Sequence, residues 1–188
     1  MHTCGLAEGA LGNNAILGPA QTIVNGYAFA HKFRKTQNVA VTMFGDGASN
    51  RGEFHEGLNM AAIWNLPAIY IINNTHYAVS FSKDRQQKVK DISSRAAGYG
   101  IPGVSIDGND ILTVVETVGE AVKRAREGGG PTLIEFKTYR WAGHFIGDPA
   151  LCRPEEEVAL WKSPEKEPIA RFEKVLKERK VATQEDFD

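Results

Sequence analysis

The sequence predicts an α/β fold, doubly wound around a mostly parallel sheet. Residues 39–44 and 68–72 are apolar runs joined by a helix-like segment, which is the pattern of a βαβ unit. A second helix-like segment, 111–127, leads into the apolar run 132–137. Polar residues follow the first two runs directly, and open parallel sheets bind ligands at the carboxyl ends of their strands.

Length and composition favour one ordinary globular domain. The chain has 188 residues, with 22 basic and 23 acidic side chains and a net charge of −1. This balance gives no reason to expect nucleic acid or a membrane surface as partner. With no long apolar run and no signal peptide, a cytoplasmic protein is expected. We expect a single domain over 1–188, in which about 150–188 form a helical C-terminal extension.

The first half of the chain yields four expectations about its elements. Residues 1–18 are rich in glycine and alanine and predict a loop. Pro19 is suited to begin a helix, and its apolar stripe should face the core, with Gly26 packed closely against the sheet. The helix after Gly52 should be the crossover between the two strands. Its predicted core residues are Phe54, Leu58, Ala61, Ala62 and Trp64, and those of the first helix are Ile23, Tyr27, Ala30 and Phe29 or Phe33.

The second half begins with a polar stretch, 81–90, that predicts a mobile loop or one ordered by a partner chain. Asp91 should cap a short helix, and 103–106 should be a short strand. Asp107 and Gly108 then imitate a second ligand-binding turn, but no second polar cluster supports a metal there, so we expect a plain turn with Asp110 capping the next helix. Helices are also expected over 154–161 and 168–180, and a capping-type helix start at Thr183.

The residues after strand 39–44 suit a diphosphate and a metal ion. Asp46 lies between Gly45 and Gly47, which allow a tight turn and close approach of a ligand to the backbone. The amides of Gly47 and Ala48 would open a helix, whose N-terminus attracts phosphate. A carboxylate beside phosphates is a natural Mg²⁺ ligand, and residues 74–77 could add a side-chain oxygen and a carbonyl. The residues alone therefore predict a diphosphate–Mg²⁺ site.

A family resemblance rests on the motifs in this region. Gly45-Asp-Gly-Ala-Ser-Asn-Arg-Gly52, Asn59-Met-Ala-Ala62, Leu66-Pro67 and Tyr77-Ala-Val-Ser80 occur in this order, with Asn73-Asn74 before the last of them. Together they resemble the thiamine-diphosphate motif, and in particular the alpha subunit of the decarboxylating component of 2-oxoacid dehydrogenase complexes. Pyruvate, branched-chain 2-oxoacid and acetoin dehydrogenases share this subunit. The resemblance covers nearly the whole chain and implies the thiamine-diphosphate-binding fold.

The resemblance implies a set of cofactor ligands. Asp46 and the carbonyl of Tyr77 would hold Mg²⁺. The family's usual asparagine ligand falls on Thr75 by counting, and its neighbour Asn74 is the alternative. Gly45, Gly47 and Ala48 would pack against the diphosphate. Ala15 and Leu17 would contact the aminopyrimidine ring, although without the resemblance their segment reads as a plain surface loop.

A second functional stretch follows strand 132–137. Arg140 is suited to phosphate, and His144 could hydrogen-bond an oxyanion or move a proton. The family has an arginine and a histidine at these positions, near the diphosphate and the substrate entrance, so His144 is the candidate catalytic residue; the alternative is a loop histidine without a role. Phe145 and Gly147 occupy places where the animal pyruvate enzyme has phosphorylatable serines, which argues against that control and gives the loop an acetoin-type character.

The resemblance implies the alpha subunit, possibly split, of a pyruvate dehydrogenase-like enzyme, which decarboxylates a 2-oxoacid oxidatively and passes the acyl group to lipoyl. Acetoin dehydrogenase is the alternative. Expected partners are a beta subunit in a heterotetramer, the lipoyl acyltransferase core and a separate N-terminal alpha fragment, because Met1 matches a point well inside the family's subunit. The alternative from another functional class is a non-catalytic paralogue or assembly fragment. A dinucleotide enzyme or a phosphatase fits poorly, since Asp46 precedes Gly-Ala and no Gly-x-Gly-x-x-Gly follows a first strand.

Overall fold

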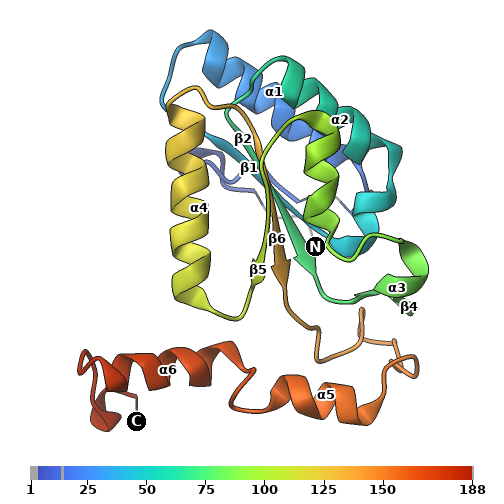
Figure 1. The fold of residues 1–188 in the computed structure, drawn as a ribbon, viewed down its shortest axis with the longest axis vertical. Helices are drawn as coiled ribbons and strands as arrows, with labels where there is room; N and C mark the ends of the chain where they lie inside the picture. The colour runs from blue at the N-terminus through green and yellow to red at the C-terminus, as the bar shows by residue number, and fades with distance from the viewer. Residues whose placement is uncertain (1–3, 14, 188) are drawn as a thin grey trace.

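The computed structural model describes residues 4–13 and 15–187 and confirms the α/β class. Its central sheet has four parallel strands in the order β1-β2-β6-β5. Helices α1 and α2 lie on one side of the sheet and α4 on the other, as a doubly wound sheet requires (Figure 1). The strands are β1 (Ala40–Gly45), β2 (Ala68–Asn74), β5 (Gly103–Asp107) and β6 (Thr132–Lys137), and the helices are α1 (Pro19–Phe33), α2 (Gly52–Ile63) and α4 (Ile111–Arg126).

Two hydrophobic cores cover the two faces of the sheet. Strand β2 is buried along most of its length because helices cover it on both sides, which explains its continuous apolar sequence. On the α1–α2 face the core includes Phe54, Leu58 and Leu133, and on the α4 face it includes Ile71 and Ile134. In α2, the predicted core residues Phe54, Leu58 and Ala61 are confirmed as buried, whereas Trp64 is 46% exposed.

The predicted core stripe of α1 is wrong except at Tyr27, which is partly buried and packs against the core on the α1–α2 face. Ile23, Phe29 and Phe33 are exposed, and the buried positions are Gln21, Val24, Asn25 and Ala28. The helix presents this face because Asn25 donates a 2.8 Å hydrogen bond to the carbonyl of Gly57 in α2 and accepts one from the hydroxyl of Tyr70 in β2. The closely packed glycine is Gly57, where an added Cβ would lie 3.1 Å from the Gln21 carbonyl oxygen; Gly26 is exposed, with nothing within 4 Å of such a Cβ.

The stretch 81–90, expected as a loop, is partly ordered by its own chain. Strands β3 (Tyr77–Ala78) and β4 (Phe81–Ser82) form a short antiparallel hairpin, and α3 (Lys83–Gln86) follows. Asp91 does not cap the next segment, η3 (Ile92–Tyr99), which is a 3-10 helix. Its carboxylate instead forms a 2.6 Å ion pair with Lys137, which offers a full charge where the helix end offers only amides.

Five further segments complete the description: η1 (Leu6–Glu8), η2 (Asp46–Asn50), α5 (Glu155–Lys162), α6 (Pro168–Glu178) and η4 (Gln184–Asp186). Thr183 and Asp186 form the predicted capping box. Helices α5 and α6 lie beyond the carboxyl ends of the strands (Figure 1). Among residues 4–13 and 15–187, no helix combines the length and apolarity needed to cross a bilayer.

Candidate functional site

A cavity of about 340 Å³ lies at the carboxyl ends of β1 and β2. The two strands end side by side because they pair in parallel, with Gly45 opposite Asn73. The cavity brings together most of the residues predicted from sequence, and it also includes residues that the sequence did not indicate. The predicted residues that line the cavity are Leu17, Gly45, Asp46, Gly47, Ala48, Thr75, Arg140 and His144. The other lining residues are Met43, Phe44, Asn73, Ala78 and Val79.

Three oxygen atoms from the two strand ends gather beside this cavity. Asp46 is 1% exposed, and its Oδ1 lies 3.4 Å from the Thr75 hydroxyl oxygen. The same hydroxyl lies 3.4 Å from the carbonyl oxygen of Tyr77. Because Mg²⁺ holds its ligands at about 2.1 Å in octahedral geometry, neighbouring ligand oxygens lie about 3 Å apart. The Thr75 hydroxyl is therefore only slightly farther from each of the other two oxygens than it would be in such a ligand shell.

The two candidates for the side-chain ligand face different directions. Asn74 is buried, and its Nδ2 donates a 2.6 Å hydrogen bond to Glu135 Oε1. Its Oδ1 accepts from the backbone amide of His76 at 3.0 Å. Both ends of the Asn74 amide are thus engaged away from Asp46, whereas the Thr75 hydroxyl faces it.

The glycines on either side of Asp46 serve different purposes. An added Cβ on Gly47 would lie 2.6 Å from the Cβ of Ala78, so Gly47 allows the β3–β4 hairpin to pack closely. An added Cβ on Gly45 would meet nothing within 4 Å, in line with its place at the open cavity. The expected helix at Gly47 is only a five-residue 3-10 turn, η2 (Asp46–Asn50), and the α-helix begins at Gly52.

Arg140 and His144 meet at the cavity wall. Arg140 Nη1 lies 3.1 Å from His144 Nδ1, and Arg140 Nη2 donates to the carbonyl of Val79 at 3.1 Å. A guanidinium can only donate, so His144 Nδ1 accepts and the ring proton resides on Nε2. The loop is braced by Asp148, which accepts from the amide of His144 at 2.7 Å; this and the amide of Ala150 lower the pKa of Asp148. His144 thus keeps an Nε2–H with which to donate to an oxygen.

Of the two residues expected at the aminopyrimidine ring, one lines the cavity and the other does not. Leu17 lines the cavity and is 60% exposed, so an apolar wall is present where a ring could pack. Ala15 is also exposed but is outside the cavity lining. Met43, a wall residue missed from sequence, precedes Gly45 by two positions on the same strand; the period-two alternation of β1 was the signal that could have indicated it.

An aromatic cluster links the oxygen site to α5. The Tyr77 hydroxyl donates a 2.7 Å hydrogen bond to Glu157, and Trp161 stacks on Tyr139 with ring centroids 5.5 Å apart. The ring of His76 also lies 5.5 Å from that of Trp161. Burial, with Glu157 nearby, raises the pKa of Tyr139 to about 12. The side chain of Tyr77 thus points toward α5 while its carbonyl stays beside Thr75, a division no sequence pattern indicates.

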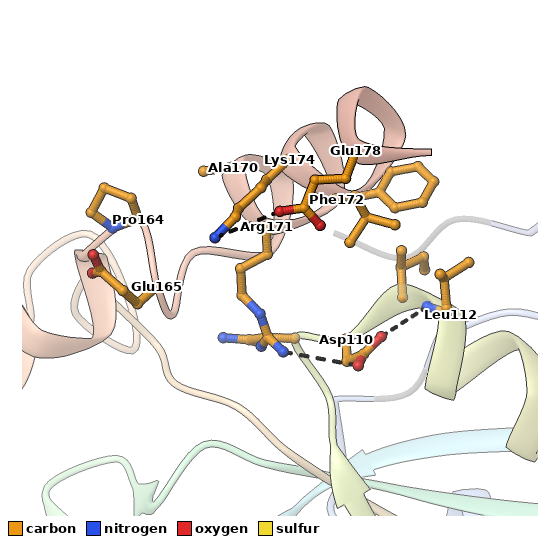
Figure 2. Close-up of a pocket in the computed structure, with 12 residues that line it drawn as sticks. Asp110, Leu112, Pro164, Glu165, Ala170, Arg171, Phe172, Lys174 and Glu178 are labelled. Atoms are coloured by element: carbon orange, nitrogen blue, oxygen red, sulfur yellow. Dashed lines mark hydrogen bonds and ion pairs between the residues drawn. The ribbon is translucent and has the colours of Figure 1, made fainter. Parts of the chain in front are cut away.

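A second cavity, of about 560 Å³, lies between the start of α4 and helix α6 (Figure 2). Most of its charged side chains form ion pairs. Arg171 lies 2.8 Å from Asp107 and 4.0 Å from Asp110, and Lys174 lies 3.9 Å from Glu178. Asp110 also accepts from the amide of Leu112 (Figure 2), which confirms its predicted capping role. We interpret this hollow as the contact between α6 and the sheet domain.

The described residues contain no group of three or more histidine, cysteine, aspartate or glutamate side chains able to hold a metal. This excludes a zinc-type centre from the described part of the chain. The cluster around Asp46 is of another kind, because two of its three oxygens come from a hydroxyl and a backbone carbonyl. Such a mixed donor set suits Mg²⁺ rather than a transition metal.

His55 on α2 yields a prediction about pH. Its ring is hydrogen-bonded to the Tyr99 hydroxyl, and partial burial, together with Arg95, lowers the pKa of His55 below the ordinary value near 6.5. Below about pH 6.5 the unfolded chain takes up this proton more readily than the fold, so stability decreases on acidification. His55→Gln should make the fall in Tm between about pH 7.5 and 5.5 shallower. An equal or steeper fall, measured by circular dichroism, would contradict this.

Comparisons with known proteins agree with this geometry. The family model described as "Dehydrogenase E1 component" matches residues 1–188. The chain is 44% identical over 188 residues to the alpha subunit of acetoin:2,6-dichlorophenolindophenol oxidoreductase of Cupriavidus necator, covering 100% of this chain and 56% of the relative. It is 46% identical over 157 residues to the Bacillus subtilis protein of the same name, covering 84% of this chain and 47% of the relative.

A pyruvate dehydrogenase relative is almost as similar. The chain is 39% identical over 187 residues to the E1 component subunit alpha of pyruvate dehydrogenase from Rhizobium meliloti, covering 100% of this chain and 53% of the relative. The chain thus spans about half the length of the curated relatives it matches. Its motifs, its parallel sheet and the match over the whole chain lead to one conclusion: the chain belongs to the dehydrogenase E1 component family.

Proposed function

We propose that this chain provides a diphosphate- and metal-binding part of the alpha subunit of a thiamine-diphosphate-dependent dehydrogenase. The observation that carries the proposal is the gathering of the Asp46, Thr75 and Tyr77 oxygens beside a cavity that also contains Arg140. A hard-oxygen cluster next to a guanidinium fits a Mg²⁺–diphosphate group, because the ion and the arginine together neutralise its charge.

Each residue has a role in this proposal. Asp46 Oδ1, Thr75 Oγ1 and the Tyr77 carbonyl would hold Mg²⁺, and Arg140 would donate to the diphosphate. Leu17 and Ala15 would contact the rings, and the Nε2–H of His144 would donate to a substrate oxygen as negative charge develops on it. The backbone of Gly45, Gly47 and Ala48 would lie along the diphosphate. When bound, thiamine diphosphate supplies the carbanion chemistry of 2-oxoacid decarboxylation.

The assembly is part of the same proposal. The relatives are named as alpha subunits, which supports a beta subunit as partner, in a heterotetramer. Exposed apolar residues on α1 and α2, such as Phe33 at 79% and Ile63 at 71%, supply surface that a partner could cover. A lipoyl acyltransferase core and a cytoplasmic location complete the proposed arrangement.

Two substrate classes remain open within this proposal. A pyruvate-type 2-oxoacid dehydrogenase is the principal reading, and acetoin dehydrogenase is the alternative. The acetoin reading draws on the loop around Phe145 and Gly147 and on the identity to two acetoin relatives; the pyruvate reading draws on relatives that cover the chain equally fully. The enzyme would oxidise either substrate only together with its partners.

The test is purification of the tagged chain from its native host, with partners identified by mass spectrometry and bound thiamine diphosphate measured. The recovered assembly is then assayed for reduction of dichlorophenolindophenol with pyruvate, a branched-chain 2-oxoacid or acetoin. Cofactor, a beta subunit and turnover of one substrate would support the enzyme and identify its class. Recovery of the chain without cofactor or turnover would instead support a non-catalytic assembly fragment.

Position 75 allows a more specific prediction. A carboxamide oxygen is a better neutral donor to Mg²⁺ than a hydroxyl, and it reaches further from the backbone. Thr75→Asn should therefore strengthen Mg²⁺-dependent cofactor binding, whereas the isosteric Thr75→Val should weaken it. Calorimetric titration of the recovered assembly with thiamine diphosphate measures both. If Thr75→Val bound as tightly as the parent chain, Thr75 would not be a metal ligand.

A further inference from the structure

Glu135 is an unusual residue for the interior of this sheet. It lies in the middle of β6 and is 0% exposed, opposite Ile72 in β2 and Ser105 in β5. A buried carboxylate is costly unless hydrogen bonds replace its water. No ion pair within 4 Å involves Glu135 among the described residues, so its direct partners are backbone and amide donors, with the charge of Arg95 acting from farther away.

Both oxygens of Glu135 are used. Oε1 accepts from Asn74 Nδ2 at 2.6 Å, and Oε2 accepts from the backbone amide of Ser93 at 3.0 Å. A carboxylate is the side chain that can accept at both oxygens in this place. Glutamine would turn an NH₂ group toward one of the two donors.

The hydrogen bonds continue from Glu135 to the oxygen cluster. Asn74 Oδ1 accepts from the amide of His76, which closes a local turn and holds His76 at a φ of 67°, in the left-handed region. His76 lies between Thr75 and Tyr77 in the chain, and the turn brings the Thr75 hydroxyl and the Tyr77 carbonyl to the same side. The backbone carbonyl of Asn74 is also fixed, since it accepts from Thr138 at 2.9 Å.

We propose that Glu135 is a positioning residue, which acts through Asn74 to hold the 74–77 turn in the shape that binds the metal ion. The proposal rests on the proposed function, because it assigns a purpose to the shape of that site. Glu135 itself does not line the cavity. Residues behind metal ligands commonly change metal affinity by about 10- to 100-fold when they are replaced.

Exchanging the carboxylate at position 135 with the amide at position 74 tests this positioning role. Glu135→Gln alone turns an NH₂ group toward Asn74 or Ser93, and Asn74→Asp alone sets two carboxylates against each other. The double variant restores the pattern in reverse. The new amide at position 135 donates through its nitrogen to the new carboxylate at position 74 and accepts through its oxygen from Ser93, and the second carboxylate oxygen accepts from His76. If the two substitutions acted independently, their losses of metal affinity would add in the double variant and would not be recovered.

Two quantities are measured on the full chain with its co-purifying partners and thiamine diphosphate. Electron paramagnetic resonance reports the affinity for Mn²⁺, the probe for Mg²⁺, and hydrogen exchange reports protection of the 74–78 segment. Each single variant should lose about tenfold or more in Mn²⁺ affinity and show faster exchange. The double variant should recover most of both. Leu133→Val, on the same strand and equally buried, is the control and should leave both unchanged.

The outcomes separate the inference from the function on which it rests. If the parent assembly binds Mn²⁺ but Glu135→Gln binds it equally well, or the double variant is no better than the weaker single one, the positioning role is overturned. If the parent assembly does not bind Mn²⁺, the proposed function itself fails, and the inference with it. Should Glu135→Gln fail to fold, Asn74→Ala removes the side chain that joins Glu135 to the amide of His76, and unchanged Mn²⁺ affinity there would overturn the role as well.

Discussion

Replacing Asp46 with asparagine should greatly weaken Mg²⁺-dependent binding of thiamine diphosphate while leaving the fold intact. Asp46 supplies the carboxylate of the oxygen cluster, and the neutral amide keeps its size. Two unit charges 4 Å apart attract by about 4 kcal/mol at an effective dielectric constant of about 20, so the affinity should fall on the order of 100-fold or more. Calorimetric titration of the purified assembly measures the loss, and circular dichroism checks the fold.

The chain offers a matched control for this substitution. Asp107 ends strand β5 and precedes Gly108, as Asp46 precedes Gly47, but its carboxylate pairs with Arg171 at the edge of the second cavity. Asp107→Asn should leave cofactor affinity unchanged. Equal losses in the two variants would mean that a general charge effect, and not a ligand at position 46, is being measured.

Phe54→Ala should strongly destabilise the fold, by about 3–5 kcal/mol of unfolding free energy. Phe54 is 0% exposed, and its ring packs edge-on against Phe44, with centroids 5.9 Å apart. The guanidinium of Arg95 lies over the same ring at 6.0 Å. Because Phe44 directly precedes Gly45, the cavity left behind would also loosen the end of β1. Urea denaturation followed by tryptophan fluorescence measures the effect.

Phe145→Ala is the corresponding surface control. This side chain is 62% exposed, so its removal should change the unfolding free energy by about 0.5 kcal/mol or less. If the two substitutions lowered the unfolding free energy equally, the α1–α2 face of the sheet would not be the principal core that the packing around Phe54 indicates.

Most of the sheet could be predicted from sequence because its signals are local. Strands β2 and β6 are largely apolar and begin just after Pro67 and Pro131, and their predicted starts agree with the structure. The face of α1 could not be predicted in the same way. Gln21 and Asn25 are buried through contacts with α2 and β2, which lie far along the chain, and hydropathy favours the opposite face.

The same distinction between local signals and contacts distant in the chain applies to the candidate site. Asp46 and Thr75 each follow a strand end, so parallel pairing was enough to predict that they meet. The sequence left Thr75 and Asn74 as alternatives because the family's asparagine ligand falls on Thr75 by counting, while the neighbouring residue is the asparagine; the structure separates them, since Thr75 faces Asp46 and Asn74 is bonded to Glu135. That difference depends on Glu135 in another strand. The contact of Tyr77 with Glu157 was missed for the same reason, since it joins residues 80 positions apart.

The most direct test of the metal site is paramagnetic broadening of backbone amide signals by Mn²⁺, recorded on the assembly with thiamine diphosphate. The structure predicts that amides around Asp46, Thr75 and Tyr77 broaden first, because these residues surround the oxygen cluster. Amides around Asp107 should remain sharp. Broadening centred on Asp107 and Asp110, or spread evenly over the acidic surface, would contradict a metal site at the ends of β1 and β2.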